Sequence, residues 1–191
     1  MSSPIAHSSL MILAWPIVRH RVRAGLSSTR RILLAGLVLL SLMAPDLDLV
    51  QCLWGGMKVT DSHNYFSHSV FVAPMFAIPF AFLCRWIAGG SWVFYAVFAC
   101  LAYWSHIFLD AATWGRGVQM FWPLADGRFS TPYPLFYGVR HSVGAPWWAY
   151  LITVANDVGF GLLLWLIARR WWMKGGETVP SRQAPQIRTP S

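Results

Sequence analysis

Five apolar segments, separated by polar or glycine- and proline-bearing stretches, dominate the pattern of the chain. They cover residues 5–18, 32–50, 70–88, 91–112 and 147–168. A helix needs roughly 20 apolar residues to cross a bilayer. The first segment is short for this and suits a partial or interfacial span. The pattern predicts an all-α fold, a multi-pass transmembrane helical bundle. We expect one membrane-embedded domain over residues 1–174 and a disordered cytoplasmic tail over residues 175–191.

The composition agrees with a chain that faces lipid. Hydrophobic residues make up 56% of the 191 positions, charged residues make up 12%, and the mean hydropathy is +0.47. The net charge of +8 would favour a nucleic-acid partner if the basic residues formed a polar face, but most of them flank apolar segments. We therefore expect the lipid bilayer as the partner and no nucleic acid, while the oligomeric state stays open.

The basic residues also predict how the chain crosses the membrane. Most of the 15 lie in the loop at 19–31, in the turn at 85 or from 169 onward. The four exceptions are Lys58, Arg116, Arg128 and Arg140. Because basic loops stay in the cytoplasm, five segments place the N-terminus outside and the C-terminus inside. The same topology brings a set of histidines and aspartates to the outer membrane surface. Because the topology was inferred from the basic residues alone, this convergence is independent support for a single site.

The stretch Ser105-His106-Ile107-Phe108-Leu109-Asp110, which closes the fourth apolar segment, carries the clearest chemical signal. A histidine and an aspartate four apart share one helix face, and burying them unpaired costs several kcal/mol. Imidazole nitrogens combined with carboxylate oxygens suit zinc, and also manganese or iron. The metal ligands expected at the outer surface are His7, Asp46, Asp48, His63, His68, His106 and Asp110.

This set exceeds the needs of one tetrahedral ion, so we expect one or two divalent ions, with a carboxylate such as Asp46 or Asp48 as the bridge. Asp46 is also the candidate catalytic base. On a regular helix the two aspartates point to different sides, and Pro45 predicts a break that turns both inward. Each ligand also has a plainer interpretation, as part of a helix end, as a solvated loop histidine or as a member of a structural ion pair.

Three further polar residues carry weaker signals. Arg128 and Arg140 lie in the glycine- and proline-rich outer loop, where they would bind a phosphate group of the substrate or remain solvated charges. Asp157 lies near the middle of the fifth apolar segment. An intramembrane carboxylate is a candidate functional group, and a hydrogen bond that packs two helices explains it equally well.

The order of these elements resembles the YdjM-like, membrane-bound, metal-dependent hydrolase family of the bacterial inner membrane. The family pattern has an N-terminal histidine, Pro-Asp-x-Asp, His-Arg-Gly-x-Ser/Thr-His-Ser, Ser-His-x-x-x-Asp followed by Thr and Gly, and Trp-Pro. The chain offers His7, residues 45–48, 63–69 and 105–110, Thr113, Gly115 and Trp122-Pro123. It departs from the pattern at Asn64-Tyr65, where the family has Arg-Gly, so an arginine suited to phosphate is missing.

The resemblance implies a multi-pass inner-membrane hydrolase that uses a divalent metal ion, and the family is distantly similar to zinc-dependent phospholipase C-like enzymes. Since the expected site lies at the depth of lipid head groups, a phosphoester of a lipid or lipid-linked molecule is the expected substrate. The residues leave two alternatives open. One is a transporter whose His/Asp cluster relays protons or ions, and the other is a structural membrane protein stabilised by a metal.

Overall fold

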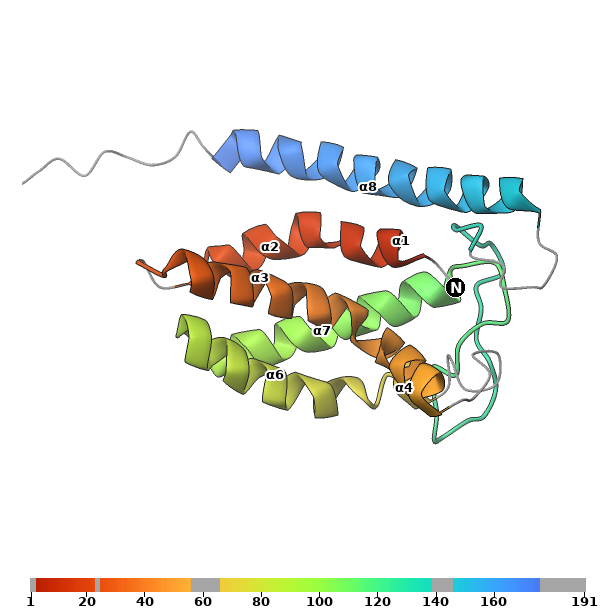
Figure 1. Cartoon of the computed structure of the whole chain (residues 1–191), viewed down its shortest axis with the longest axis horizontal. Coiled ribbons are helices and arrows are strands. Elements are labelled where there is room, and N and C mark those ends of the chain that lie inside the picture. The colour runs from red at the N-terminus through yellow and green to blue at the C-terminus, as the bar shows by residue number, and fades with distance from the viewer. Residues whose placement is uncertain (1–2, 23–24, 56–65, 139–145, 176–191) are drawn as a thin grey trace, which may run out of the picture.

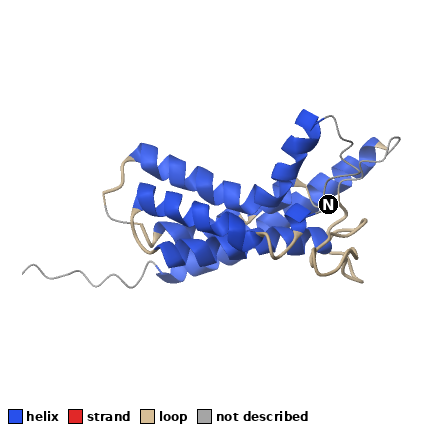
Figure 2. Cartoon of the chain, turned by 90° about the horizontal axis from the view of Figure 1, so that it is seen from below, coloured by secondary structure: helices blue, strands red, loops and turns tan. Residues whose placement is uncertain are grey.

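The computed structural model describes residues 3–22, 25–55, 66–138 and 146–175. In these ranges it is a bundle of helices that, apart from the short α4, run along a common long axis (Figures 1 and 2). The helices are α1 (Pro4–Ser9), α2 (Met11–Arg19), α3 (Ser28–Met43), α4 (Asp48–Gly55), α6 (Ala73–Ala88), α7 (Trp92–Ala111) and α8 (Trp147–Gly175). Two 3₁₀ turns are η1 (Ala44–Leu47) and η2 (Phe66–His68). The all-α prediction is confirmed, because these ranges contain isolated β-bridges but no strand.

Three stretches of the described chain are long and apolar enough to cross a membrane. They are Ser28–Val50, Trp92–Ala111 and Trp147–Arg170, and α6 is a shorter apolar helix. The first apolar segment is divided into the two short helices α1 and α2, with Pro16 inside α2. Figure 1 shows α1 and α2 following the same axis as α3, so the apolar segments run back and forth along the bundle.

The main hydrophobic core lies among α2, α3, α6 and α7. Its fully buried members include Val18, Leu34, Val38, Ala81 and Tyr95. A tight turn at Gly89 and Gly90, with φ of +69° and +84°, joins α6 to α7. The Ser91 hydroxyl then caps α7 by accepting a hydrogen bond from the Phe94 amide. The hairpin therefore sets the direction in which α7 carries its polar C-terminal residues.

The chain after α7 folds back over the end of the bundle. The amide of Thr131 donates to the Ala111 carbonyl at 2.8 Å, and the amide of Leu135 donates to the Ala112 carbonyl at 2.7 Å. At Gly117 (φ +72°) a Cβ would collide with the Phe129 carbonyl oxygen, so the close approach requires glycine. Figure 1 places this loop beside α4 and the start of α1.

The last helix, α8, packs along α1 and α2 (Figure 1). Near the middle of α8, the Phe160 ring meets the Phe136 ring of the loop edge-on at 5.0 Å. The backbone amide of Ser3 donates a hydrogen bond to Asp157 Oδ2 at 3.2 Å. This contact ties the N-terminal residue of the described chain to the final helix, and it holds the start of α1 in place.

Candidate metal centre

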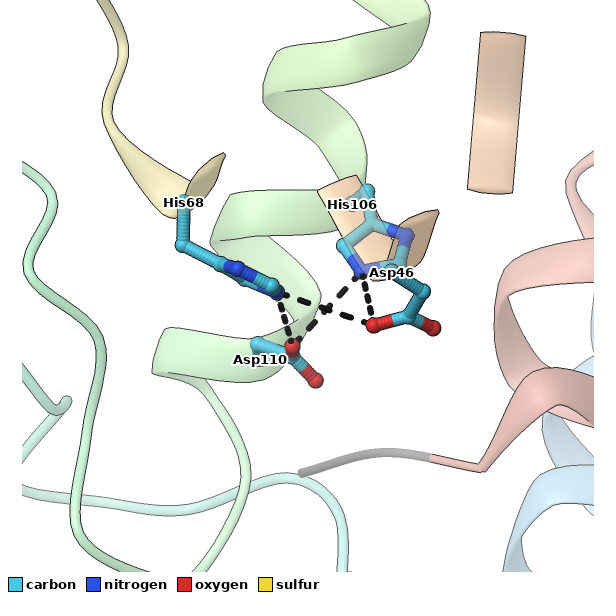
Figure 3. A group of neighbouring side chains, drawn as sticks. All are labelled: Asp46, His68, His106 and Asp110. Carbon is cyan, nitrogen blue, oxygen red and sulfur yellow. Dashed lines mark ion pairs between the residues drawn. The ribbon is translucent and has the colours of Figure 1, made fainter. Parts of the chain in front are cut away.

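Four polar side chains converge at the loop end of the bundle. Asp46 comes from η1, His68 comes from η2, and His106 and Asp110 lie one turn apart on α7 (Figure 3). One ligand atom of each residue lies within 4.8 Å of those of the other three. Three segments that are remote in sequence therefore build one compact group of two imidazole nitrogens and two carboxylate oxygens.

The interatomic distances in this group suit a tetrahedral ion. His68 Nε2 lies 3.2 Å from Asp110 Oδ2 and 3.7 Å from Asp46 Oδ1. His106 Nε2 lies 3.3 Å from Asp46 Oδ1 and 3.6 Å from Asp110 Oδ2. Four ligand atoms bound to one zinc ion at 2.0–2.1 Å lie about 3.3–3.5 Å apart along the edges of the tetrahedron. These four edges are therefore close to those around a zinc-sized divalent ion, and the other two edges are at most 4.8 Å.

The hydrogen bonding of His106 supports the same conclusion. Its Nδ1 lies 2.7 Å from the Leu42 carbonyl oxygen, an atom that can only accept, so Nδ1 carries the hydrogen. In the neutral ring Nε2 then presents a lone pair toward the two carboxylate oxygens. Within the described residues this fully buried nitrogen makes no hydrogen bond. Two anionic oxygens around one nitrogen favour a positive charge at this point, which a bound cation would supply.

His68 is oriented by a short chain of hydrogen bonds. The Ser67 hydroxyl donates to Asp48 Oδ2 at 2.6 Å and lies 3.0 Å from His68 Nδ1. Because the hydroxyl hydrogen points to the carboxylate, the oxygen is left to accept from Nδ1. This leaves Nε2 of His68 to face Asp46 and Asp110, as Nε2 of His106 does. Asp48 therefore helps to orient His68 through the Ser67 hydroxyl and does not contribute an atom to the four-atom group.

The electrostatics around His68 favour a cation. Burial of its ring opposes the charged form, but the neighbouring carboxylates of Asp110 and Asp46 outweigh burial and raise the pKa of His68 to about 9. The carboxylates therefore hold a second proton on the ring at neutral pH. A divalent ion would satisfy the same carboxylates in place of that proton, as metal binding generally releases protons from its ligands.

His7, on α1, lies against the same group. Its ring stacks on that of His106 with the centroids 3.5 Å apart and an angle of 8° between the planes. Its Nε2 lies 3.4 Å from Asp110 Oδ1, whereas Oδ2 of the same carboxylate faces His68 and His106. Asp110 thus presents its two oxygens to different histidines, and His7 lies beside the four-residue group without being part of it.

Comparison with protein families identifies the chain. The model of one family, described as YdjM inner membrane protein, matches residues 7–175. This chain belongs to the YdjM inner membrane protein family. The match extends from His7 to the end of α8 and includes the whole four-residue group. No curated protein matches the chain. No solved structure matches it either.

In this YdjM-family protein, the other predicted site residues lie outside the four-residue group or outside the described residues. His63 and Arg140 fall outside the described residues. Arg128 lies in the loop after α7, where its Nη1 donates to the Gly117 carbonyl at 3.1 Å. Its role in binding substrate stays a prediction. Asp157 is fully buried on α8 and accepts its hydrogen bond from Ser3, so the structure places it against α1 and not in the four-residue group.

Two contacts that orient the site were not predicted from the sequence. The Leu42 carbonyl that fixes His106 leaves no sequence signal, because any residue supplies a carbonyl. The Tyr103 hydroxyl donates to the Ser67 carbonyl and holds the turn that carries His68. Its position three residues before His106, on the same face of an apolar helix, is a signal that could have identified it.

Proposed function

We propose that this YdjM-family protein is a membrane-bound, metal-dependent hydrolase that cleaves a phosphodiester of a lipid or lipid-linked molecule at the outer face of the inner membrane. The observation that carries the proposal is the group of two histidines and two aspartates at the end of α7. The buried Nε2 atoms of its two histidines face two carboxylates, whose negative charge a divalent cation would balance. Zinc is the ion proposed, and manganese and iron share its ligand preferences.

Such an ion would polarise a phosphoryl oxygen and make a water molecule more acidic by accepting one of them as a fifth ligand beside the four side chains. Asp46 is the member of the group that water reaches most readily, since its side chain is 12% exposed whereas those of His68, His106 and Asp110 are fully buried. We assign it the role of accepting a proton from the attacking water. The water oxygen bonds to phosphorus, the bond from phosphorus to the leaving oxygen breaks, and that oxygen takes up a proton.

The proposed lipid substrate follows from where the site lies. Asp46 lies in the apolar stretch Ser28–Val50, and His106 and Asp110 lie in Trp92–Ala111. The group therefore lies near the end of membrane-crossing stretches, next to the loop that follows α7. A lipid head group at the membrane surface is already at the depth of this group, whereas a soluble substrate would have to move from water into the membrane surface.

The test uses protein loaded with zinc and reconstituted into vesicles of phosphatidylethanolamine and phosphatidylglycerol. We expect the release of water-soluble phosphate compounds, with Asp46→Asn and His106→Ala reducing it at least a hundredfold, the lower end of the range of about 10²–10⁴ typical of lost acid–base catalysis. Asp126→Asn, the same change at an exposed loop carboxylate, is the matched control and keeps full release. Fully loaded wild-type protein that cleaves neither vesicle lipids nor soluble phosphodiesters would refute the proposal.

A second candidate function is transport of a proton or an ion, and Asp157 is the observation that favours it. This carboxylate is fully buried on a membrane-crossing stretch. Its Oδ2 accepts from the Ser3 amide, while within the described ranges its Oδ1 makes no hydrogen bond. Hydrolysis at the membrane surface does not need an ionised group there, whereas a relay would.

A further inference from the structure

An apolar groove of about 270 Å³ lies on the side of the bundle between α2 and α7. Its floor is formed by the buried residues Ala14, Leu42 and Ala102. Its rims are formed by Ile17, Val97 and Leu101, which are 50%, 53% and 57% exposed. A buried floor with exposed rims makes the groove accessible from the side, where the bilayer surrounds the bundle.

The lining of the groove selects hydrocarbon. Its one hydroxyl is that of Ser105, which already donates to the Ala102 carbonyl at 2.7 Å. The other lining side chains are aliphatic or phenylalanine. No charged group lines it, so a polar ligand would lose its hydration without gaining partners. A hydrocarbon chain has no polar groups and would not have this desolvation cost.

The groove adjoins the metal centre. Leu42 belongs to both, since its side chain lines the groove and its carbonyl oxygen accepts the hydrogen bond from His106. Ala102 lies one helical turn before His106 on the same face of α7. Leu10 likewise lines the groove one turn after His7. One elongated molecule could therefore touch the metal centre with one end and the groove with the other.

The length of the groove matches an acyl chain. Along α7 the lining extends from Phe94 to Ser105, which corresponds to about 16 Å at the rise of an α-helix. The hydrocarbon core of a bilayer is ~30 Å thick, so the groove extends over about half of that depth. The groove can therefore take one chain over most of its length.

We propose that the groove binds one acyl chain of a bilayer lipid whose phosphate-bearing head group lies at the Asp46–His68–His106–Asp110 centre. The inference rests on the proposed hydrolysis for what happens to the head group, but binding of the chain does not require turnover. It makes the preferred substrate a glycerophospholipid or another long-chain lipid instead of a soluble phosphodiester.

The test measures phosphatidylglycerol bound to detergent-purified, zinc-loaded protein by native mass spectrometry. Wild-type protein is expected to retain one lipid per chain. Leu101→Trp places a bulky ring at the rim and should weaken retention roughly tenfold. Leu162→Trp is the matched control, because Leu162 is 58% exposed on α8 and does not line the groove. Val97→Trp repeats the test at the same rim if Leu101→Trp does not fold, and zinc content reports that the centre is intact.

Equal retention by wild type, Leu101→Trp and Leu162→Trp would overturn the inference. So would a dimer that only Leu101→Trp dissociates, because a second copy of the chain would then cover the groove. Groove-dependent retention without any hydrolysis would leave the inference standing and refute the proposed function. Hydrolysis that is equally fast in Leu101→Trp, for both long-chain and short-chain esters, would refute the inference and leave the function standing.

Discussion

His106 donates its Nδ1 hydrogen to the carbonyl oxygen of Leu42, 2.7 Å away at the end of α3. The bond links α3 to α7 and fixes the tautomer of the ring before any ion is bound. It leaves Nε2 facing Asp46 Oδ1 at 3.3 Å. A backbone carbonyl is a common partner for the outward nitrogen of a metal-bound histidine, because it sets the orientation of the ring and increases its basicity.

The first prediction concerns metal content. Wild-type protein purified in detergent with zinc present should hold one or two ions per chain, and the double variant His68→Ala/His106→Ala should hold none, because half of the four-atom group is removed. Mass spectrometry of the metal measures this directly. His20→Ala, a change at an exposed histidine outside the cluster, should retain the wild-type content. Binding of zinc by the double variant at wild-type stoichiometry would place the ion elsewhere.

The second prediction concerns the support behind His68. Ser67→Ala breaks the chain from Asp48 to His68 Nδ1 without removing any of the four ligand atoms. We expect the same stoichiometry but zinc affinity about 10–100-fold weaker, the range for lost partners of metal ligands. Competition with a chelating dye measures the affinity. Ser91→Ala removes a hydroxyl that caps the opposite end of α7 and should not change it; an equal loss there would show that the effect is not specific.

Removal of the metal separates a catalytic ion from a structural one. The main core among α2, α3, α6 and α7 contains none of the four ligands. A chelator should therefore abolish turnover while the far-ultraviolet circular dichroism at 25 °C stays unchanged. Stability should fall only by the linkage energy, about 2.7 kcal/mol for an ion present at 100 times its dissociation constant. Unfolding at 25 °C on chelation would instead support the metal-stabilised structural protein.

Orientation in the membrane is a separate prediction, based on the basic loops. The C-terminus should lie in the cytoplasm, because Arg169, Arg170 and Lys174 follow the last apolar segment. A green fluorescent protein fused there should fluoresce, and an alkaline phosphatase fused there should be inactive. Fusions in the loop after α7 should behave in the opposite way. The reverse result would place the centre in the cytoplasm and exclude a substrate in the outer leaflet.

The sequence predicted the helical architecture well, because long apolar segments in lipid can satisfy their backbone groups only as helices. It also predicted that Pro45 marks a break, and the structure has η1 at that position. The division of the first segment into α1 and α2 was less clear, since a short apolar run with a proline suits several arrangements. Helix boundaries depend on caps such as Ser27, whose hydroxyl accepts from the Arg30 amide.

The candidate site was predictable as a set of residues but not as a geometry. His106 and Asp110 share a helix face, and this spacing is visible in the sequence. The different positions of Asp46 and Asp48 relative to His68 depend on η1 and η2, whose 3₁₀ geometry no periodicity reveals. The contact of His7 with Asp110 depends on tertiary packing of α1, so a lone histidine near the N-terminus gave little indication of it.

Asp157 provides the sharpest test between hydrolysis and transport. Its Oδ2 accepts a hydrogen bond from Ser3, the residue that caps α1, and α1 carries His7. Asp157→Asn keeps an acceptor oxygen but cannot ionise. If the carboxylate only positions α1, the Asn variant should retain zinc and turnover. Asp157→Ala, which lacks the acceptor, should lower the free energy of unfolding by about 1.5–3 kcal/mol, the usual worth of a hydrogen bond to a charged group.

A transporter predicts the reverse pattern, because a relay needs a group that takes up and releases protons or ions. Asp157→Asn would then retain zinc and fold normally, yet it would lose ion flux in vesicles as completely as Asp157→Ala. Asp126→Asn repeats the same change at an exposed loop carboxylate and should affect neither measurement. Turnover and flux measured on the same vesicles therefore decide between the two functions, because only the relay requires ionisation of a carboxylate in the middle of α8.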